Sequence, residues 1–157
     1  MTVSKSPRRV VVVGNGMVGF KFCEKLRTLD PDRHFQITVL GEEPRPAYDR
    51  VHLSEYFSGK SAEDLSMAPQ DWYAQQDIDL QLGTLVTQID RQQRTVTTQL
   101  GQQVQYDYLV LATGSAPFVP PIPGVEKDGV FVYRTLEDLE AIEAVGKKVS
   151  SAAVIGG

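Results

Sequence analysis

The sequence predicts an α/β fold with a parallel sheet, and three observations lead to this prediction. An uninterrupted run of valines, residues 10–13, is typical of a strand that is buried on both faces of a parallel sheet. A glycine-rich turn follows this run, and residues 17–29 then carry apolar side chains at helical spacing. A second apolar run, residues 35–40, completes a βαβ unit of the usual length.

The elements of this βαβ unit have clear ends. The predicted helix over residues 17–29 carries apolar side chains at intervals of three and four, namely Val18, Phe22, Leu26 and Leu29. Asp30-Pro31-Asp32 ends the helix, because proline disfavours helical backbone in the residue before it. The second strand, residues 35–40, is closed by the turn-forming residues 41–44.

The middle of the chain predicts a different, antiparallel arrangement. Residues 44–66 are rich in turn formers, with a short helix around residues 53–57, and a helix over 69–76 presents Trp72 and Tyr73 as a cover over the sheet. Alternating segments then predict a small antiparallel meander of strands, residues 80–82, 85–89, 95–99 and 104–106. A fully apolar strand, residues 108–112, follows the meander.

The last part of the chain predicts a linker and the start of a second domain. Four prolines between residues 115 and 124 favour an extended segment. A helix over 135–145 follows, with Thr135 as N-cap and Asp138 as the acid of a capping box. Residues 151–157 repeat the opening pattern of a short apolar strand that runs into glycines. We therefore divide the chain into residues 1–114 and residues 115–157.

Composition excludes several classes of function. A formal net charge of −4 argues against nucleic acid or an anionic membrane as partner. No stretch reaches the ~18 apolar residues that a membrane span needs, so we expect a cytoplasmic protein. A single cysteine, Cys23, excludes an internal disulfide and is interpreted as a core residue. His34 and His52 form no recognisable metal set.

The glycine-rich turn after the first strand has the spacing of a dinucleotide-binding fingerprint, Gly-x-Gly-x-x-Gly. Gly14 permits the tight turn, Gly16 lets a pyrophosphate approach the backbone, and Gly19 lets the helix pack against the sheet. Asn15 and Met17 lie within the same turn, where amides at the start of the helix point toward phosphate. The pattern predicts a Rossmann-like nucleotide site.

An acid at the end of the second strand is the remaining part of this fingerprint. Glu42 lies about 20 residues beyond Gly19, where a carboxylate accepts hydrogen bonds from the ribose hydroxyls. Glu43 is the alternative, and we prefer Glu42.

Beyond the fingerprint, the strand–meander–strand order resembles the two-dinucleotide flavoprotein reductases. Its last strand ends in Ala112-Thr113-Gly114, which resembles the turn that closes over FAD in that family. Tyr48-Asp49-Arg50-Val51-His52-Leu53-Ser54 resembles a segment of the ferredoxin-reductase-like branch, and this resemblance gives Arg50 a role at the FAD pyrophosphate. Glu55 stands where that branch often has a lysine near the flavin. The resemblance also places the Val86 backbone beside the adenine, with a simple core role as the alternative.

Within that branch, the chain is most similar to the start of NAD(P)H-dependent nitrite reductase large subunits, and Asn15-Gly16-Met17 is the most specific piece. The resemblance implies an enzyme of nitrate assimilation that passes electrons from NAD(P)H through FAD to a later redox centre. An iron–sulfur cluster and sirohaem, where nitrite is reduced, and a possible small subunit or dimer partner are implied beyond these residues. A ferredoxin or rubredoxin reductase shares these motifs, and a non-catalytic nucleotide-binding module is the alternative of another class.

The final glycines, residues 156–157, stand where a second fingerprint for NAD(P)H begins in this family. We therefore expect the chain to be a piece of a longer protein, without turnover of NAD(P)H by itself and with apolar surface exposed.

Overall fold

The computed structural model describes residues 6–156, which divide into two compact units. Among the described residues, the first unit consists of residues 6–49 and 66–114, and the second consists of residues 50–65 and 115–156. The predicted division into residues 1–114 and 115–157 concerns domains of the whole protein and stays a prediction.

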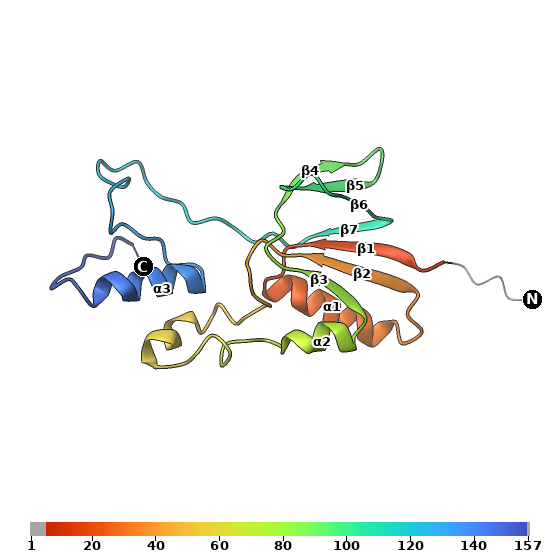
Figure 1. Ribbon diagram of the computed structural model, residues 1–157, viewed down its shortest axis with the longest axis horizontal. Helices are drawn as coiled ribbons and strands as arrows, with labels where there is room; N and C mark the ends of the chain where they lie inside the picture. Colours follow the sequence, from red (N-terminus) through yellow and green to blue (C-terminus); the bar gives the residue numbers. More distant parts are fainter. Residues whose placement is uncertain (1–5, 157) are drawn as a thin grey trace, which may run out of the picture. The chain divides into compact units, whose positions relative to one another are not determined.

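A four-stranded parallel sheet forms the centre of the first unit (Figure 1). Its order is β3 (Ile78–Gln81), β2 (Phe35–Leu40), β1 (Arg8–Val13) and β7 (Tyr108–Leu111). All three pairs of neighbours run parallel, with Val10 opposite Ile37 on one side and opposite Tyr108 on the other. The predicted α/β fold with a parallel sheet is confirmed.

A small antiparallel sheet follows β3, and it has three strands rather than four. They are β4 (Val86–Asp90), β5 (Thr95–Thr98) and β6 (Gln103–Gln105), in that order. The prediction that residues 80–82 belong to this meander is wrong, because β3 pairs in parallel with β2. Its first residue, Ile78, is buried against the helices and anchors the strand to the larger sheet.

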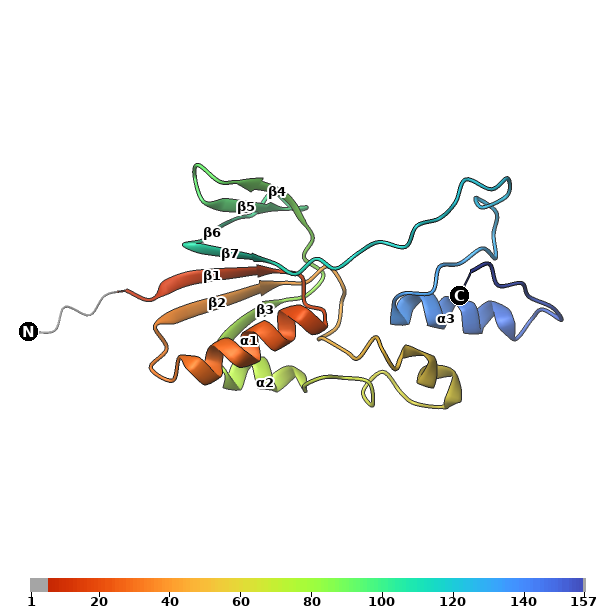
Figure 2. The ribbon, with the colours of Figure 1, turned by 180° about the vertical axis from the view of Figure 1, so that it is seen from behind.

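The first unit has three layers, because the parallel sheet is covered on both faces (Figure 2). Helices α1 (Met17–Leu29) and α2 (Gln70–Gln75) cover one face, where Val10 and Val12 of β1 are buried. The antiparallel sheet covers the other face, where Val11 and Val13 are buried against Val96. Alternate side chains of β1 therefore enter two different cores, and this explains its unbroken valine run.

The buried face of α1 differs from the stripe that the sequence suggested. Val18 and Leu29 are about 70% exposed, whereas Phe20 and Cys23 are buried against the sheet. Arg27 is buried on the same face, so the side of the helix that contacts the sheet includes a charged residue. The error arises because the three hydrogen-bond acceptors for Arg27 are tertiary features.

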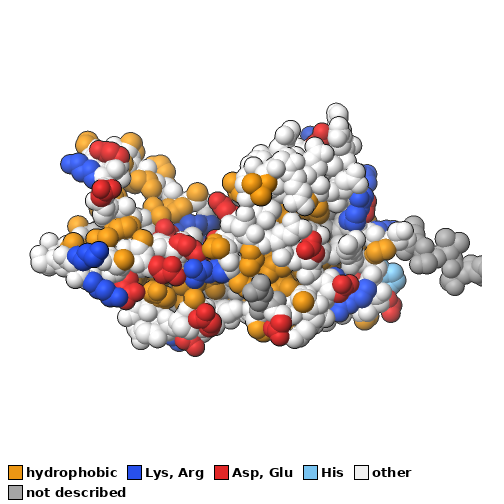
Figure 3. All heavy atoms as spheres, viewed as in Figure 1, with side chains coloured by type: hydrophobic (Ala, Val, Ile, Leu, Met, Phe, Trp, Pro, Cys, Tyr) orange, Lys and Arg blue, Asp and Glu red, His pale blue; other side chains and the backbone are white. Residues whose placement is uncertain are grey.

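The second unit contains a short 3₁₀ helix, η1 (Leu53–Ser58), and helix α3 (Leu136–Gly146). The predicted capping box is confirmed: the Asp138 amide donates to Thr135 Oγ1, and the Thr135 amide donates to the Asp138 carboxylate. Residues 115–122 form neither helix nor strand, as their prolines predict. Apolar side chains remain at the surface of this unit (Figure 3), among them Phe118, Ile122, Val130, Phe131, Val154 and Ile155.

The predicted strand at the end of the chain is wrong for the residues that the structure describes. Residues 151–156 have no regular secondary structure, and Gly157 lies outside the described residues. A strand requires a neighbour for its backbone hydrogen bonds, and no described strand pairs with this segment.

The amino end of the parallel sheet is closed by an ion pair between β1 and the residue before β7. Arg9 Nη2 lies 3.1 Å from Asp107 Oδ1, and the Arg9 backbone amide donates to Asp107 Oδ2 at 2.7 Å. Hydrogen bonds from the Arg9 side chain and backbone lower the pKa of Asp107 to about 2.

This ion pair predicts a loss of stability in acid. Because the folded pKa lies below the ordinary value of about 3.9, the stabilisation is complete above pH ~5 and is lost as the pH falls toward 2. In urea titrations between pH 6 and pH 3, we expect the stability difference between the wild type and Asp107→Asn to shrink steadily below pH 5. A difference that stayed constant would contradict this account, and Asp32→Asn, at an exposed site, is the control.

Candidate functional site

The predicted fingerprint residues lie at the carboxyl edge of the parallel sheet. Because β1, β2 and β7 run in the same direction, their carboxyl ends meet at one edge. The chain leaves β1 toward β2 on one side, whereas β7 lies on the other side of β1. Such a point of reversal leaves a crevice, and it is where open α/β sheets bind ligands.

Gly14 and Gly19 make the close approaches that the fingerprint predicts. Gly14 has a φ of +105°, and a Cβ on it would come within 2.2 Å of the Ala112 carbonyl oxygen. A Cβ on Gly19 would come within 2.1 Å of the Gly14 carbonyl oxygen. The loop after β1 is therefore clamped between the first turn of α1 and the end of β7, with no room for side chains at either glycine.

Gly16 stands in contrast, because a Cβ on it would meet no atom within 4 Å. It is the N-cap of α1, no acidic residue occupies the first turn, and Met17 is the first residue of the helix. The hydrogen-bonded ladder begins with the Phe20 amide, which donates to the Gly16 carbonyl at 3.0 Å. The amides before Phe20 thus have no acceptor within the helix, which leaves an opening where donors and the positive end of the helix dipole suit an anion.

The side chain of Asn15, within this loop, is held by a hydrogen bond. Its Oδ1 accepts a hydrogen bond of 3.0 Å from the hydroxyl of Tyr73. A Cβ on Gly41 would lie 2.9 Å from the Asn15 Cβ, so the loop also packs closely against the end of β2. The structure thus brings the glycine-rich loop next to the turn that carries the two candidate acids.

The two candidate acids have different environments. Glu42 is exposed, and its carboxylate has no hydrogen bond or ion pair with the rest of residues 6–156. Glu43 is half-buried, and its Oε2 accepts a 2.7 Å hydrogen bond from the hydroxyl of Tyr48. Because the Glu43 carboxylate is already engaged within the protein, the geometry favours Glu42 as the acceptor for a ligand.

The predicted residues on the far side of the loop lie at the end of β7 and in β4. The Ala112 amide donates to the Val13 carbonyl and extends the pairing of β1 with β7. Thr113 is exposed, and Gly114 has a φ of +68°, which lets the chain turn away from the sheet. The Val86 side chain packs on the core between the two sheets, which includes Val11 and Val96. It lies next to a break in register between β4 and β5.

Arg50 belongs to the second unit, unlike the other predicted site residues. Its Nη1 donates to the carbonyl oxygen of Arg134 at 3.1 Å. Arg134 Nη1 in turn donates to Ser115 Oγ at 3.2 Å. This connection between the segment after Asp49 and the segment before α3 carries no signal in the sequence.

A shallow depression of about 710 Å³ lies at the opposite, amino end of the sheet. Its lining includes Arg8, Arg9, Gln36, Arg94, Asp107 and Tyr108. The Arg9 guanidinium is paired with Asp107 and that of Arg8 donates to the Tyr108 hydroxyl, so both have structural roles. The fingerprint residues lie at the other edge of the sheet.

Comparison with known proteins agrees with this geometry. Residues 8–157 match the sequence profile of the family described as "Pyridine nucleotide-disulphide oxidoreductase". The chain belongs to this family. Membership confirms the predicted class of oxidoreductase and the resemblance from which it was inferred.

The chain is similar to nitrite reductase large subunits. It is 49% identical over 148 residues to the "Nitrite reductase [NAD(P)H] large subunit" of Klebsiella oxytoca, covering 94% of this chain and 16% of the relative. It is 46% identical to the NADH-dependent large subunit of Escherichia coli K12, covering 95% of this chain and 18% of the relative. The chain thus spans less than a fifth of each of these relatives.

The fold is similar to that of a solved reductase. The structure of the covalent putidaredoxin reductase–putidaredoxin complex matches with a TM-score of 0.79 and 34% identity. The match covers 90% of this chain and 34% of that chain. It confirms the predicted combination of a Rossmann-like parallel sheet with a small antiparallel sheet.

Two further findings concern helices that could span a membrane and side chains that could hold a metal ion. Across residues 6–156, no helix is long and apolar enough to cross a membrane. Within the same range, no group of three or more His, Cys, Asp and Glu side chains is placed to hold a metal ion.

Proposed function

We propose that this chain is the FAD-binding segment of an NAD(P)H-dependent nitrite reductase large subunit. The observation that carries the proposal is the 49% identity to such a subunit over nearly the whole chain. The match to the putidaredoxin reductase complex is weaker, at 34% identity. That match supports the second candidate, a ferredoxin- or rubredoxin-reductase-like flavoenzyme, which would use the same site.

The residues at the carboxyl edge fit the ADP half of FAD. The opening above Gly16 admits a pyrophosphate, and the amides at the start of α1 supply donors for its oxygens. Asn15 and Met17 shape this loop, and the exposed carboxylate of Glu42 is free to accept from ribose hydroxyls. The small antiparallel sheet, which takes the place of a further βα unit, supports FAD over NAD as the first dinucleotide.

The remaining site residues receive roles through the family resemblance. We assign Arg50 to the FAD pyrophosphate, the Val86 backbone to the adenine, and Ala112, Thr113 and Gly114 to the turn over the cofactor. Glu43 supports the turn that carries both acids through its hydrogen bond with Tyr48. We also assign residues 1–114 to the FAD-binding domain and 115–157 to the linker and the start of an NAD(P)H-binding domain.

In this proposal the chain orients the cofactor and supplies electrostatics. FAD, when bound, supplies the chemistry that connects hydride from NAD(P)H with single electrons. We place the iron–sulfur cluster, the sirohaem and the reduction of nitrite in parts of the whole protein beyond these residues. A cytoplasmic location and a small subunit or dimer partner stay predictions.

The first experiment is an absorbance spectrum after incubation with FAD and desalting. It uses the 157-residue chain and the same chain joined to the downstream residues of the Escherichia coli relative. Retained flavin bands in the longer protein support the proposal. Two colourless proteins would overturn it.

Gly16→Ala should separate binding from folding. Gly16 has a φ of −87° and open space above it, so alanine should change the free energy of unfolding by under about 1 kcal/mol. The added methyl group would stand where the pyrophosphate approaches, and FAD affinity should fall at least about tenfold. Fluorescence titration with FAD and a urea titration measure the two effects. Unchanged affinity would place the pyrophosphate elsewhere.

A further inference from the structure

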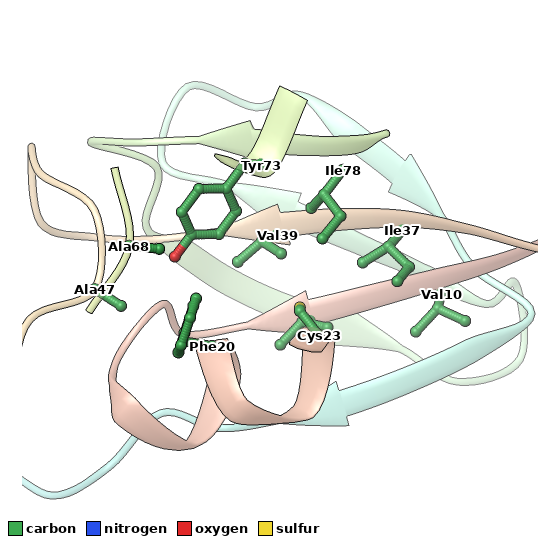
Figure 4. Close-up of a cluster of buried hydrophobic side chains, with 10 residues drawn as sticks. Val10, Phe20, Cys23, Ile37, Val39, Ala47, Ala68, Tyr73 and Ile78 are labelled. Atoms are coloured by element: carbon green, nitrogen blue, oxygen red, sulfur yellow. The ribbon is translucent and has the colours of Figure 1, made fainter. Parts of the chain in front are cut away.

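Tyr73 connects three segments of the first unit. Its side chain is 1% exposed and lies in the core between the helices and the parallel sheet. Figure 4 shows its hydroxyl directed toward the end of this core where Ala47 and Ala68 lie. The hydroxyl donates to Asn15 Oδ1 at 3.0 Å, and Ala47 is buried in the same core cluster as Tyr73. One phenol thus joins α2, the glycine-rich loop and the segment after the acid turn.

Asn15 depends on this hydrogen bond. Its Nδ2 is shielded from solvent and has no hydrogen-bond partner within residues 6–156. Tyr73 is therefore the hydrogen-bond partner that the described residues provide for this side chain. Asn15 also packs at Gly41, directly before Glu42. A shift of Asn15 would therefore displace both the glycine-rich loop and the turn that carries Glu42.

Tyr73 is itself held firmly, although α2 has only six residues. Its ring packs edge-on against Phe20 of α1, with centroids 6.3 Å apart, and Trp72 packs on the same phenylalanine at 4.9 Å. A buried hydroxyl with a hydrogen-bond partner and a fixed ring has little freedom. It therefore fixes the side chain to which it donates.

We propose that Tyr73 is a positioning residue for the nucleotide site: its hydrogen bond to Asn15 holds the glycine-rich loop and the Glu42 turn in the arrangement that receives an adenosine diphosphate group. This inference rests on the proposed function, and it assigns a role to a residue that does not contact the ligand. A loop ordered in advance loses less conformational freedom when the ligand binds.

The test is the affinity for ADP and for FAD in Tyr73→Phe. It is measured by calorimetry and fluorescence, in the chain joined to the downstream residues of the Escherichia coli relative. Tyr106→Phe is the matched control, since Tyr106 is 7% exposed and its hydroxyl lies 3.5 Å from the Asp90 carbonyl oxygen, in the other core. Asn15→Ala and the double variant with Tyr73→Phe complete a thermodynamic cycle.

We expect Tyr73→Phe to weaken the binding of both ligands by about three- to tenfold, the range that one buried hydrogen bond contributes. Tyr106→Phe should leave both affinities unchanged. The double variant should bind no more weakly than the weaker single variant, because both changes remove the same interaction. A merely structural role would not produce this lack of additivity in ligand affinity.

Wild-type affinity in Tyr73→Phe would overturn the inference, and so would equal losses in Tyr73→Phe and Tyr106→Phe. If Tyr73→Phe fails to fold, Asn15→Ala carries the test, with wild-type affinity overturning the inference. Binding of neither ligand by the wild type would overturn the proposed function and this inference together. Normal wild-type binding with an unaffected Tyr73→Phe would overturn the inference alone.

Discussion

Gly14→Ala should lower the free energy of unfolding by at least about 3 kcal/mol. Two costs combine at this position. Alanine is strained at a φ of +105°, and its Cβ would lie 2.2 Å from the Ala112 carbonyl oxygen. Because that oxygen belongs to the main chain, relief requires β1 and β7 to move apart. Urea denaturation followed by circular dichroism measures the loss, and FAD retention should disappear with it.

Gly101→Ala is the matched control for Gly14→Ala. Gly101 has a φ of +78°, but a Cβ on it would meet no atom within 4 Å. Its replacement should therefore cost only the backbone strain, roughly 1 kcal/mol. Equal losses at the two positions would show that the contact with Ala112 does not contribute.

Arg27→Met should destabilise the protein by about 3 to 5 kcal/mol. The guanidinium is 3% exposed and donates to three carbonyl oxygens, those of Phe35, Gln76 and Asp77, at 2.7 to 2.8 Å. It also lies 3.8 Å from the Asp30 carboxylate. Methionine retains much of the apolar stem, but it removes the side-chain donor of the Phe35 and Asp77 carbonyl oxygens and one of the two side-chain donors of the Gln76 oxygen.

Thermal or urea unfolding of Arg27→Met measures this loss, and Arg33→Met is its control. Arg33 is half-buried and donates through Nη1 to the Gln76 carbonyl oxygen, one of the acceptors that Arg27 uses. Its replacement should cost about 1 kcal/mol, the contribution of one hydrogen bond. If Arg27→Met cost no more than Arg33→Met, the three-carbonyl arrangement would not be the source of stability.

Local pattern was sufficient to predict the parts of the fold in which burial follows sequence spacing. The valine run of β1 indicated a strand buried on both faces, and Val10 and Val11 do enter different cores. The capping box of α3 depends on residues three positions apart, so Thr135 and Asp138 sufficed to predict it.

Predictions failed where a partner distant in sequence decides the outcome. Residues 80–82 were predicted as a strand of the antiparallel meander, but β3 begins at Ile78, which is buried under the helices and pairs in parallel with Ile37. Arginine is usually a surface residue, so Arg27 was not expected in the core. The carbonyl oxygens near residue 76 that accept its hydrogen bonds cannot be predicted from helical periodicity.

The candidate site shows the same division between local and distant information. The fingerprint predicted the glycine contacts, because Gly14 and Gly19 belong to one short motif. It could not distinguish the environments of Glu42 and Glu43, since the hydroxyl of Tyr48 decides them. The hydrogen bond from Tyr73 to Asn15 joins residues 58 positions apart, and the sequence suggested only a cover over the sheet.

The clamp formed by Gly14, Gly19 and the end of β7 has a consequence for genetics. The atoms that new methyl groups would strike are carbonyl oxygens of Ala112 and Gly14, which every residue type carries. A second mutation that only trims a side chain therefore cannot restore the space. Selection for intragenic suppressors of Gly14→Ala or Gly19→Ala should yield true revertants, whereas general stabilising changes should rescue Gly101→Ala.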